Sequence, residues 1–180
     1  ARRLRDEPVV FFDVGALYGY FSLVVKSLYR QSTALAFEVN PESYKALRNN
    51  VAANTHLGRP AVFCCNLGLS DQTHLAHQAS LQGFRLDEDT AGGQTIVDLM
   101  RLDDFSRITS FVPDLMKIDV EGYQSRILPG AMDTIAAAKP TILMEFDEPH
   151  ILERFGKTNA DVVRPLFDLG YSMLWTSDHR

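Results

Sequence analysis

The chain has 180 residues and a formal net charge of -5 at pH 7, with 46% hydrophobic and 23% charged residues. This length fits one domain, and this composition is typical of a globular protein and excludes a mainly disordered one. The acidic balance argues against a dedicated nucleic-acid binder, which usually carries an excess of basic residues. No apolar stretch approaches the roughly 20 residues that a membrane span needs. We therefore expect a single domain over residues 1–180, with no membrane span and no nucleic-acid partner.

The two cysteines, Cys64 and Cys65, are adjacent in an apolar run that predicts a strand. Neighbouring strand residues point to opposite faces, so a disulfide between them would have poor geometry. We predict two free, buried thiols, which suits a reducing compartment. No apolar signal core follows the basic start of the chain. The sequence thus favours a cytoplasmic location.

Strands and helices alternate along the first third of the chain. Short apolar runs rich in β-branched and aromatic residues predict buried strands, and apolar residues at helical spacing predict helices between them. Asn40, followed by Pro41 and Glu42, marks the start of a helix, because Asn caps free amides and Pro suits the first turn. The predicted elements are strands at 9–14, 34–39 and 61–65, with helices over 19–30 and from Pro41 onward.

The alternation breaks and then resumes in the rest of the chain. Residues 72–96 are polar, with Gly83 and the pair Gly92–Gly93, and predict a hairpin or irregular excursion that is a candidate substrate or interface segment. A helical stretch after residue 120 is interrupted near Pro129. The other predicted elements are strands at 95–102, 114–120, 141–146 and 171–175, and a helix over 159–169.

Near-continuous apolar strands that alternate with helices predict an α/β fold. We expect a Rossmann-like, doubly wound, mostly parallel sheet with helices on both faces. In such sheets ligands bind beyond the carboxyl ends of the strands, where the strand order reverses. The candidate functional residues are those at or just after the predicted strand ends, namely 13–19, Glu38, 66–71, 119–122 and 145–150.

The segment from Asp13 to Gly19 joins the first predicted strand to the first helix. Its glycines permit a tight turn, but their Gly-x-x-x-Gly spacing differs from the Gly-x-Gly-x-x-Gly of dinucleotide binders. The Asp13 carboxylate would repel a pyrophosphate and suits a cationic ligand such as S-adenosylmethionine, which carries an ammonium and a sulfonium. The alternative is a structural turn in which Asp13 caps a helix.

A second acid, Glu38, ends the next predicted strand, 25 residues after Asp13. An acid about 20 residues beyond the first turn reaches the ribose hydroxyls in nucleotide-binding folds of this type. A solvent-facing acid at a strand end is the alternative for Glu38 alone. The two acids at matching strand ends together favour a nucleoside site.

Six motifs extend this pattern: Phe11–Leu23, Ala36–Pro41, Asn66–Asp71, Leu102–Phe105, Lys117–Gly122 and Met144–Glu145. They resemble the successive motifs of the FkbM family of S-adenosylmethionine-dependent methyltransferases, over about Val9 to Glu148. The most specific part is Lys-Ile-Asp-Val-Glu-Gly after a Leu-Asp-Asp-Phe. Leu17 stands where that family often has Asn or His, and Val39 where it often has Pro.

The resemblance implies S-adenosylmethionine as the cofactor and assigns roles to residues of this chain. Asp13, Gly15 and Gly19 would cradle the methionine and sulfonium end, and Glu38 would hold the ribose. Asn66, Leu67 and Asp71 would flank the adenine. Ala16, Val39 and Asp119 complete the expected cofactor-binding set.

The expected catalytic residues are Lys117, Asp119, Glu121 and His150. A Lys inside a buried strand is costly unless it is paired, so we expect Lys117 in an ion network between the strands of Asp13 and Glu145. An ion pair that only organises the sheet is the alternative for Lys117. Asp119 is the first candidate for the base that takes the proton of an acceptor hydroxyl, followed by Glu121 and then His150.

The resemblance implies O-methylation of a hydroxyl on a small metabolite, such as a sugar, a polyketide or a related compound. A divalent metal on Asp119, Glu121, Asp147 and Glu148 is a rival to simple base catalysis, but no tight ligand spacing appears and we predict no metal. A catalytically inactive nucleoside-binding or interaction domain that keeps the fold is the alternative function. The expected partner is a small-molecule acceptor, and the sequence leaves open whether the protein forms a homodimer.

Overall fold

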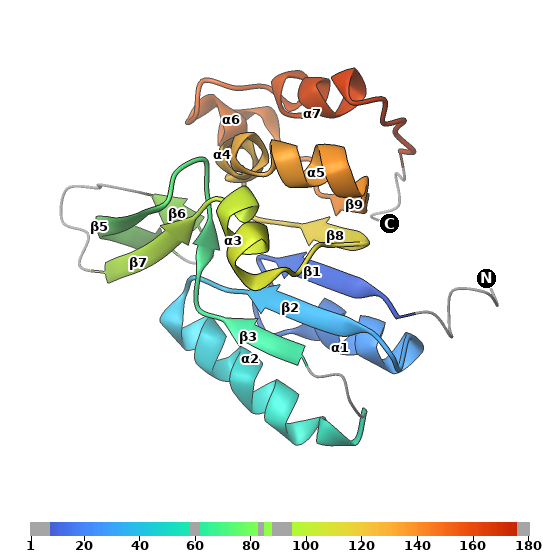
Figure 1. Ribbon diagram of the computed structural model, residues 1–180. Helices are drawn as coiled ribbons and strands as arrows, with labels where there is room; N and C mark the ends of the chain where they lie inside the picture. The colour runs from blue at the N-terminus through green and yellow to red at the C-terminus, as the bar shows by residue number, and fades with distance from the viewer. Residues whose placement is uncertain (1–7, 58–61, 83–84, 88–94, 176–180) are drawn as a thin grey trace.

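The computed structural model describes residues 8–57, 62–82, 85–87 and 95–175 (Figure 1). Its main sheet has five strands in the order β3-β2-β1-β8-β9, and every neighbouring pair is parallel. The strands are β1 (Val10–Val14), β2 (Thr33–Phe37), β3 (Val62–Cys65), β8 (Leu115–Ile118) and β9 (Thr141–Met144). The Rossmann-like, mostly parallel sheet expected from the alternation of strands and helices is confirmed.

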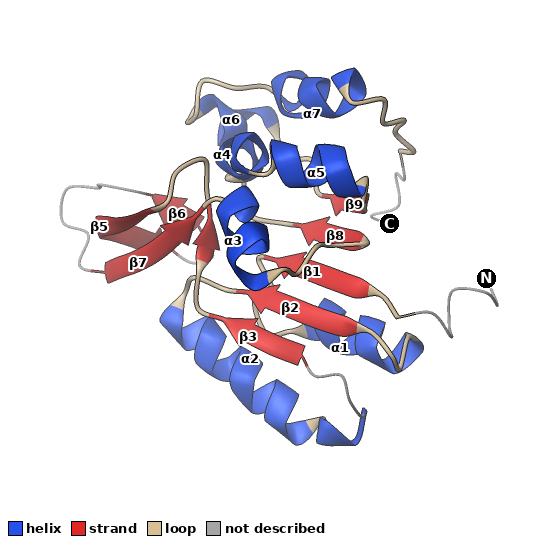
Figure 2. Ribbon diagram, in the orientation of Figure 1, coloured by secondary structure: helices blue, strands red, loops and turns tan. Residues whose placement is uncertain are grey.

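Helices cover both faces of this sheet (Figure 2). One face carries α1 (Tyr20–Leu28) and α2 (Pro41–Ala53), and the other carries α3 (Leu102–Thr109), α4 (Gln124–Ile127) and α5 (Met132–Ala138). Two short 3-10 turns, Thr55–Leu57 and Leu128–Gly130, and the helices α6 (Pro149–Glu153) and α7 (Asn159–Asp168) complete the set. The interruption predicted near Pro129 is confirmed. Within the described residues, no helix combines the length and the apolar character that crossing a membrane requires.

The main core lies between the sheet and the helices α3 to α7. Phe12 of β1, Phe37 of β2 and Phe105 of α3 meet edge to face, with ring centroids 5.0 to 6.0 Å apart. Fully burying one such side chain contributes about 1.5–3 kcal/mol. The opposite face of β1 and β2 packs more lightly, since Ala36 and Leu47 centre a smaller cluster there. Most of the buried apolar side chains that stabilise the fold therefore lie on the side of the sheet that faces α3.

A smaller sheet lies beyond the carboxyl end of β3. It holds β4 (Gly68–Leu69), β7 (Thr95–Met100), β5 (His74–Gln82) and β6 (Arg85–Asp87), in that order. β5 pairs antiparallel with both β6 and β7, which confirms the hairpin interpretation of 72–96 in its described part. Gly83 and the pair Gly92–Gly93 lie outside the described residues.

Two predicted strands need correction. The strand expected over 95–102 ends at Met100, because Leu102 already begins α3, a helix that the sequence reasoning did not include. The strand expected over 171–175 is absent, and these residues are irregular. Among the described residues β9 pairs with β8 alone, and the Tyr171 hydroxyl donates a hydrogen bond to the Pro140 carbonyl at 3.0 Å. Residues 171–175 thus follow the side of the fold without joining the ladder.

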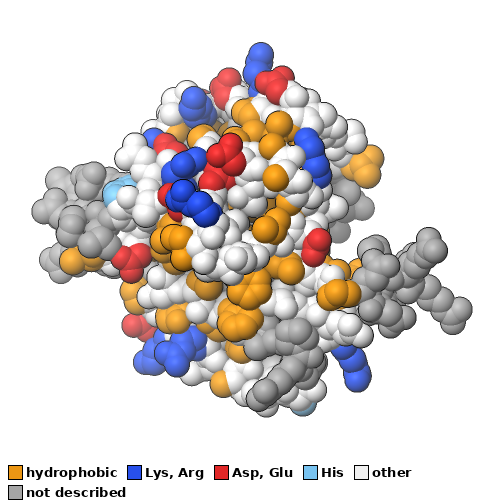
Figure 3. All heavy atoms as spheres, viewed as in Figure 1, with side chains coloured by type: hydrophobic (Ala, Val, Ile, Leu, Met, Phe, Trp, Pro, Cys, Tyr) orange, Lys and Arg blue, Asp and Glu red, His pale blue; other side chains and the backbone are white. Residues whose placement is uncertain are grey.

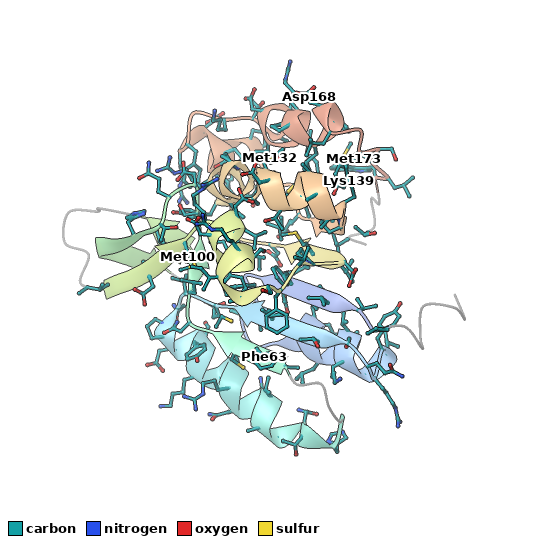
Figure 4. All side chains as sticks on the ribbon, viewed as in Figure 1. Phe63, Met100, Met132, Lys139, Asp168 and Met173 are labelled. Atoms are coloured by element: carbon teal, nitrogen blue, oxygen red, sulfur yellow. The ribbon has the colours of Figure 1, made fainter. Side chains whose placement is uncertain are left out.

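The edge strand β3 carries both cysteines. Cys64 and Cys65 are free thiols, as predicted, but they are half-buried rather than fully buried. Burial raises the pKa of both, to about 11 for Cys65, so both stay protonated and unreactive. Their neighbour Phe63 (Figure 4) is partly exposed and packs against Phe111, with ring centroids 5.7 Å apart.

Candidate functional site

A pocket of about 300 Å³ opens at the carboxyl ends of the central strands. It lies where the strand order reverses, because β1 has β2 on one side and β8 on the other. Its lining consists of Val14, Gly15, Leu17, Phe37, Glu38, Val39, Leu67, Gly68, Leu69, Asp119, Val120, Glu121, Tyr123, Ile127 and Glu145.

The turn after β1 forms one wall of the pocket and sits tightly against its neighbours. The backbone N–H groups of Gly15 and Ala16 both donate to the Phe37 carbonyl, at 3.1 and 2.9 Å. Gly15 has φ +75°, and a Cβ there would come 2.0 Å from the Asp119 carbonyl oxygen. Only glycine therefore allows this turn to touch the end of β8.

Glu38 connects the segment from Asp13 to Gly19, called the glycine turn from here on, to the start of α2. Its carboxylate accepts a hydrogen bond from the Leu17 N–H at 2.8 Å and another from the Asn40 N–H at 2.7 Å. Asn40 in turn caps α2, as predicted, because its side chain accepts from the backbone N–H groups of Glu42 and Ser43. Burial raises the pKa of Glu38, against the opposing effect of the two amides. One buried acid thus fixes two backbone segments at the rim of the pocket.

Lys117 lies directly under this wall. Its ammonium donates to the Gly15 carbonyl at 2.9 Å and lies 3.1 Å from Asp119 Oδ2 and 3.6 Å from Asp13 Oδ1. Asp13 stands beside Lys117 in the register of β1 and β8 and is fully buried. Burial raises the pKa of Asp13, while Lys117 and Ser22 oppose that rise. The structure brings Lys117 to Asp13 as expected, whereas Glu145 joins this network through Asp119.

Asp119 and Glu145 follow neighbouring strands and meet at the mouth of the pocket. The Glu145 N–H donates to the Ile118 carbonyl at 3.0 Å, and the two carboxyl groups share a hydrogen bond. That bond with Asp119, with burial and nearby carboxylates, raises the pKa of Glu145 to about 7. Burial works against ionisation of Asp119, but the Glu145 hydrogen bond and the Lys117 ammonium lower its pKa. The pair therefore gains or loses a proton around neutral pH.

Two pocket residues adopt a backbone conformation that L-residues rarely adopt. Leu17 has φ +49° and Glu121 has φ +53°, and they are two of the four non-glycine residues with positive φ in the described chain. Such conformations cost of order 1–3 kcal/mol each and cluster at functional sites. Gly122 follows with φ +91°, and a Cβ there would come 2.8 Å from the Ile151 side chain. Half of the non-glycine residues with positive φ in the described chain thus lie in the turns after β1 and β8.

Several residues predicted for the site lie behind the lining. Asp13, Ala16 and Gly19 belong to the segment that joins β1 to α1 but are absent from the pocket lining, and Gly19 packs against Leu47 of α2. The Asn66 side chain donates to the Glu38 carbonyl at 2.8 Å and so holds the ends of β2 and β3 together. These residues shape the pocket through the backbone.

Two other predicted residues lie farther away from the lining. Asp71 pairs with Arg126 of α4 at 2.8 Å. Figure 3 shows acidic and basic side chains next to each other on the face over α3 and α4. His150 is exposed on α6, 3.3 Å from Glu148, and the structure does not bring it to the pocket. The sequence placed His150 near the site only because it follows the strand end of β9 closely in the chain.

The sequence reasoning also missed some lining residues. Tyr123 and Ile127 line the wall formed by the turn after β8 and by α4, and the Tyr123 hydroxyl lies 3.2 Å from Ser70 Oγ. Glu145 was among the candidate residues 145–150 and an expected ion partner of Lys117, but it was not included in the catalytic or cofactor-binding set. Their signal was weak, because an aromatic residue after a glycine and an acid after a strand each fit many structural roles.

The chemistry of the lining suits a cation with an apolar ring. Four carboxyl groups line the pocket, on Glu38, Asp119, Glu121 and Glu145, and none of its lining residues, all within the described chain, is Lys or Arg. Aromatic and aliphatic side chains supply the remaining walls. A phosphate group would meet only negative charge here, while a sulfonium or ammonium would meet favourable charge. Within the described residues, no group of three or more His, Cys, Asp or Glu side chains is arranged to hold a metal ion.

Solved methyltransferases share this fold. The chain aligns with the methyltransferase FkbM from Methylobacillus flagellatus KT with a TM-score of 0.63 and 16% identity, over 90% of this chain and 36% of that one. It aligns with the precorrin-6y C5,15-methyltransferase from Geobacter metallireducens GS-15 with a TM-score of 0.50 and 17% identity, over 95% of this chain and 68% of that one. The fold is therefore a Rossmann-like methyltransferase fold.

The family follows from the sequence match. The model of the methyltransferase FkbM domain matches residues 13–173, and the chain belongs to this family. It is 29% identical over 172 residues to methyltransferase sdnD of Sordaria araneosa, covering 76% of this chain and 66% of the relative. It is also 29% identical over 147 residues to methyltransferase 1 of Beauveria bassiana, covering 67% and 57%. The chain thus spans less than two thirds of the length of these relatives.

Proposed function

We propose that the protein is an S-adenosylmethionine-dependent methyltransferase that methylates a hydroxyl of a small metabolite, such as a sugar, a polyketide or a related compound. The observation that carries this proposal is the acidic pocket, whose lining contains no Lys or Arg. The pocket lies where the strand order of the sheet reverses, and the chain belongs to the FkbM family. The names of the two curated relatives agree with methyl transfer.

The residues that line the pocket fit S-adenosylmethionine. Glu38 would hold the ribose hydroxyls, Leu67 and Val39 would line the adenine, and Asn66 would support that side from behind the lining. Asp71 would act on that side only from farther away, through its pair with Arg126. When bound, the cofactor supplies a methyl group on a positively charged sulfur, and its transfer to a hydroxyl forms a C–O bond, breaks a C–S bond and frees one proton. The turn from Gly15 to Leu17 would face the methionine part.

Asp119 is the residue we assign to receive that proton. It lines the pocket, and the Lys117 ammonium at 3.1 Å keeps it ionised and so able to accept a proton. Glu121 lines the same wall and is the second candidate. Holding donor and acceptor at attack distance supplies much of the acceleration, because well-oriented reactions gain about 7–11 kcal/mol. A cytoplasmic location and a homodimer remain predictions of the sequence.

Titration with S-adenosylmethionine and with its demethylated product tests the proposal. We expect saturable binding to the wild type, weaker donor binding in Glu38→Ala, and near-normal binding but low turnover in Asp119→Ala. Glu42→Ala, an exposed acid in the first turn of α2, serves as the control and should bind normally. Absence of saturation in the folded wild type rejects the proposal.

The alternative is a catalytically inactive domain, and measurement of product formation distinguishes it from an enzyme. It would bind the donor but form no demethylated product with any of a panel of sugars and polyketide alcohols. Product formation with at least one hydroxyl compound, and its loss in Asp119→Ala, supports the enzyme.

A further inference from the structure

The carboxyl groups of Asp119 and Glu145 form a pair that the register of the sheet creates. Ile118 pairs with Met144 across the parallel strands β8 and β9, so the next residue of each strand emerges at the same edge. The backbone bond from Glu145 to Ile118 at 3.0 Å locks this register. The two side chains therefore emerge next to each other, and both line the pocket. Both carboxyl groups therefore face the space that a ligand of the pocket would occupy.

Charged groups from four strands, or from the segments that follow them, surround the pair. Lys117 of β8 lies 3.1 Å from Asp119 Oδ2 and binds Asp13 of β1 on its other side. Glu121 in the turn after β8 and Asp147 in the segment after β9 both add negative charge near Glu145. Glu38 after β2 adds a further carboxyl group to the pocket lining. Lys117 thus supports the ionised form of Asp119, while the surrounding acids leave Glu145 as the group that keeps a proton.

We propose that the Asp119–Glu145 pair exchanges one proton for the positive charge of the methyl donor. The pair gives up its proton to solvent when a cationic adenosyl ligand enters the pocket, and it accepts a proton again when that charge disappears. This inference rests on the proposed function, because it takes a sulfonium compound as the ligand.

The position of Glu145 makes this exchange feasible. Its side chain is exposed at the mouth of the pocket, so a released proton has direct access to water. Its pKa of about 7 means that little free energy separates the protonated from the ionised form at neutral pH. A positive charge within a few ångströms favours the ionised form, and its loss favours the protonated one.

The protons and charges gained and lost by the pocket balance over one methyl transfer. One proton leaves Glu145 when positive charge enters the pocket. The acceptor hydroxyl later loses one proton as the C–O bond forms, and the pocket loses one positive charge as the C–S bond breaks. The pair then takes up that hydroxyl proton, which restores the starting state of the pocket. Glu145 is thus the proton store beside Asp119.

Calorimetric titration in two buffers with different ionisation enthalpies tests the exchange without any methyl acceptor. At pH 6.5 we expect release of about 0.7 proton per S-adenosylmethionine bound, and much less for S-adenosylhomocysteine, which keeps the ammonium and carboxylate of the donor but lacks its sulfonium charge. The dissociation constant for S-adenosylmethionine should fall about 6-fold between pH 6.0 and pH 7.5, and that of the thioether should change much less.

Two variants break the pair from opposite sides. Glu145→Gln has no proton to release, and Asp119→Asn removes the partner that keeps Glu145 protonated, so both should bind S-adenosylmethionine with little proton release. Saturable binding shows that each variant is folded. Glu148→Gln removes an exposed carboxyl group that lies outside the pocket lining and should release protons like the wild type.

The outcomes distinguish this inference from the proposed function. Binding without proton release in the wild type, equal release with both ligands, or release that persists in both pair variants overturns the exchange and leaves the methyltransferase proposal standing. Failure of the folded wild type to bind either ligand overturns both.

Discussion

Ser22 binds Asp13 through two hydrogen bonds that join the first turn of α1 to the end of β1. The backbone N–H of Ser22 donates to Asp13 Oδ2 at 3.0 Å, and its hydroxyl donates to the same oxygen at 2.7 Å. Both residues are fully buried, and the other Asp13 oxygen faces Lys117 at 3.6 Å. The ends of the glycine turn are thus held by a buried charge rather than by apolar packing alone.

Ser22→Ala should therefore lower the free energy of unfolding by about 1–3 kcal/mol, because it leaves a buried carboxylate oxygen with one donor fewer. Urea denaturation measures this loss. Ser27→Ala removes a hydroxyl from the same helix, one that binds only the Val24 carbonyl at an exposed position. That control should change stability by no more than about 0.5 kcal/mol, and equal losses in the two variants would contradict the role of Asp13.

Gly15→Ala and Gly156→Ala separate the cost of a backbone conformation from the cost of a clash. Both glycines have positive φ, but a Cβ meets nothing within 4 Å at Gly156 and comes 2.0 Å from the Asp119 carbonyl at Gly15. We expect Gly156→Ala to cost about 1–2 kcal/mol and Gly15→Ala to cost a further ~1–3 kcal/mol, both measured by chemical denaturation. A Gly15→Ala variant as stable as Gly156→Ala would show that the turn does not press against β8.

Glu145→Gln should change the pH dependence of stability. The pKa of Glu145 is raised in the folded protein from 4.5 to about 7, so the folded state binds this proton more tightly than the unfolded chain. The stability associated with that proton is fully present below pH 4.5 and is lost as the pH rises toward 7. The glutamine variant lacks this loss, so its stability relative to the wild type should increase from pH 5 to pH 8.

Guanidinium denaturation at the two pH values measures the difference. Glu148→Gln changes an exposed carboxyl group and should track the wild type at both. A difference between Glu145→Gln and wild type that is constant with pH would show that Glu145 does not share a proton with Asp119.

Glu38→Gln tests the rim of the pocket more finely than an alanine. A glutamine keeps one oxygen acceptor for the Leu17 or Asn40 amide but loses the charge that would bind the ribose hydroxyls. Since hydrogen bonds to charged groups contribute about 1.5–3 kcal/mol, we expect S-adenosylmethionine binding to weaken by about 10- to 100-fold. Glu42→Gln, in the exposed first turn of α2, is the matched control for calorimetry. Unchanged affinity in Glu38→Gln would move the ribose site elsewhere.

The sequence predicted those features that local chemistry determines. Asn40 before a Pro and a Glu identifies the cap of α2, and the structure shows the two capping bonds. Lys117 in a buried strand requires a partner, and the structure supplies Asp13 and Asp119. The parallel sheet follows from strands that are too apolar to face water on either side.

Features that depend on distant parts of the chain were not predicted. The proton shared by Asp119 and Glu145 depends on the register of β8 against β9, which neither strand encodes alone. The left-handed conformation of Leu17 is visible only with its hydrogen bond to Glu38 in place. Residues 171–175 have the alternation of a strand, but a strand also needs a neighbour, and Leu174 and Trp175 remain exposed.

The position of β1 between β2 and β8 also affects how the protein unfolds. Every wall residue of the pocket comes either from residues 14–69 or from residues 119–145, so neither part of the chain can build the pocket alone. A bound ligand would bridge the two parts, and its binding free energy would stabilise the whole sheet, by about 2.7 kcal/mol at a ligand concentration 100 times the dissociation constant. Melting curves recorded with and without ligand would therefore monitor the cooperativity of the entire fold, from its first strand to its last.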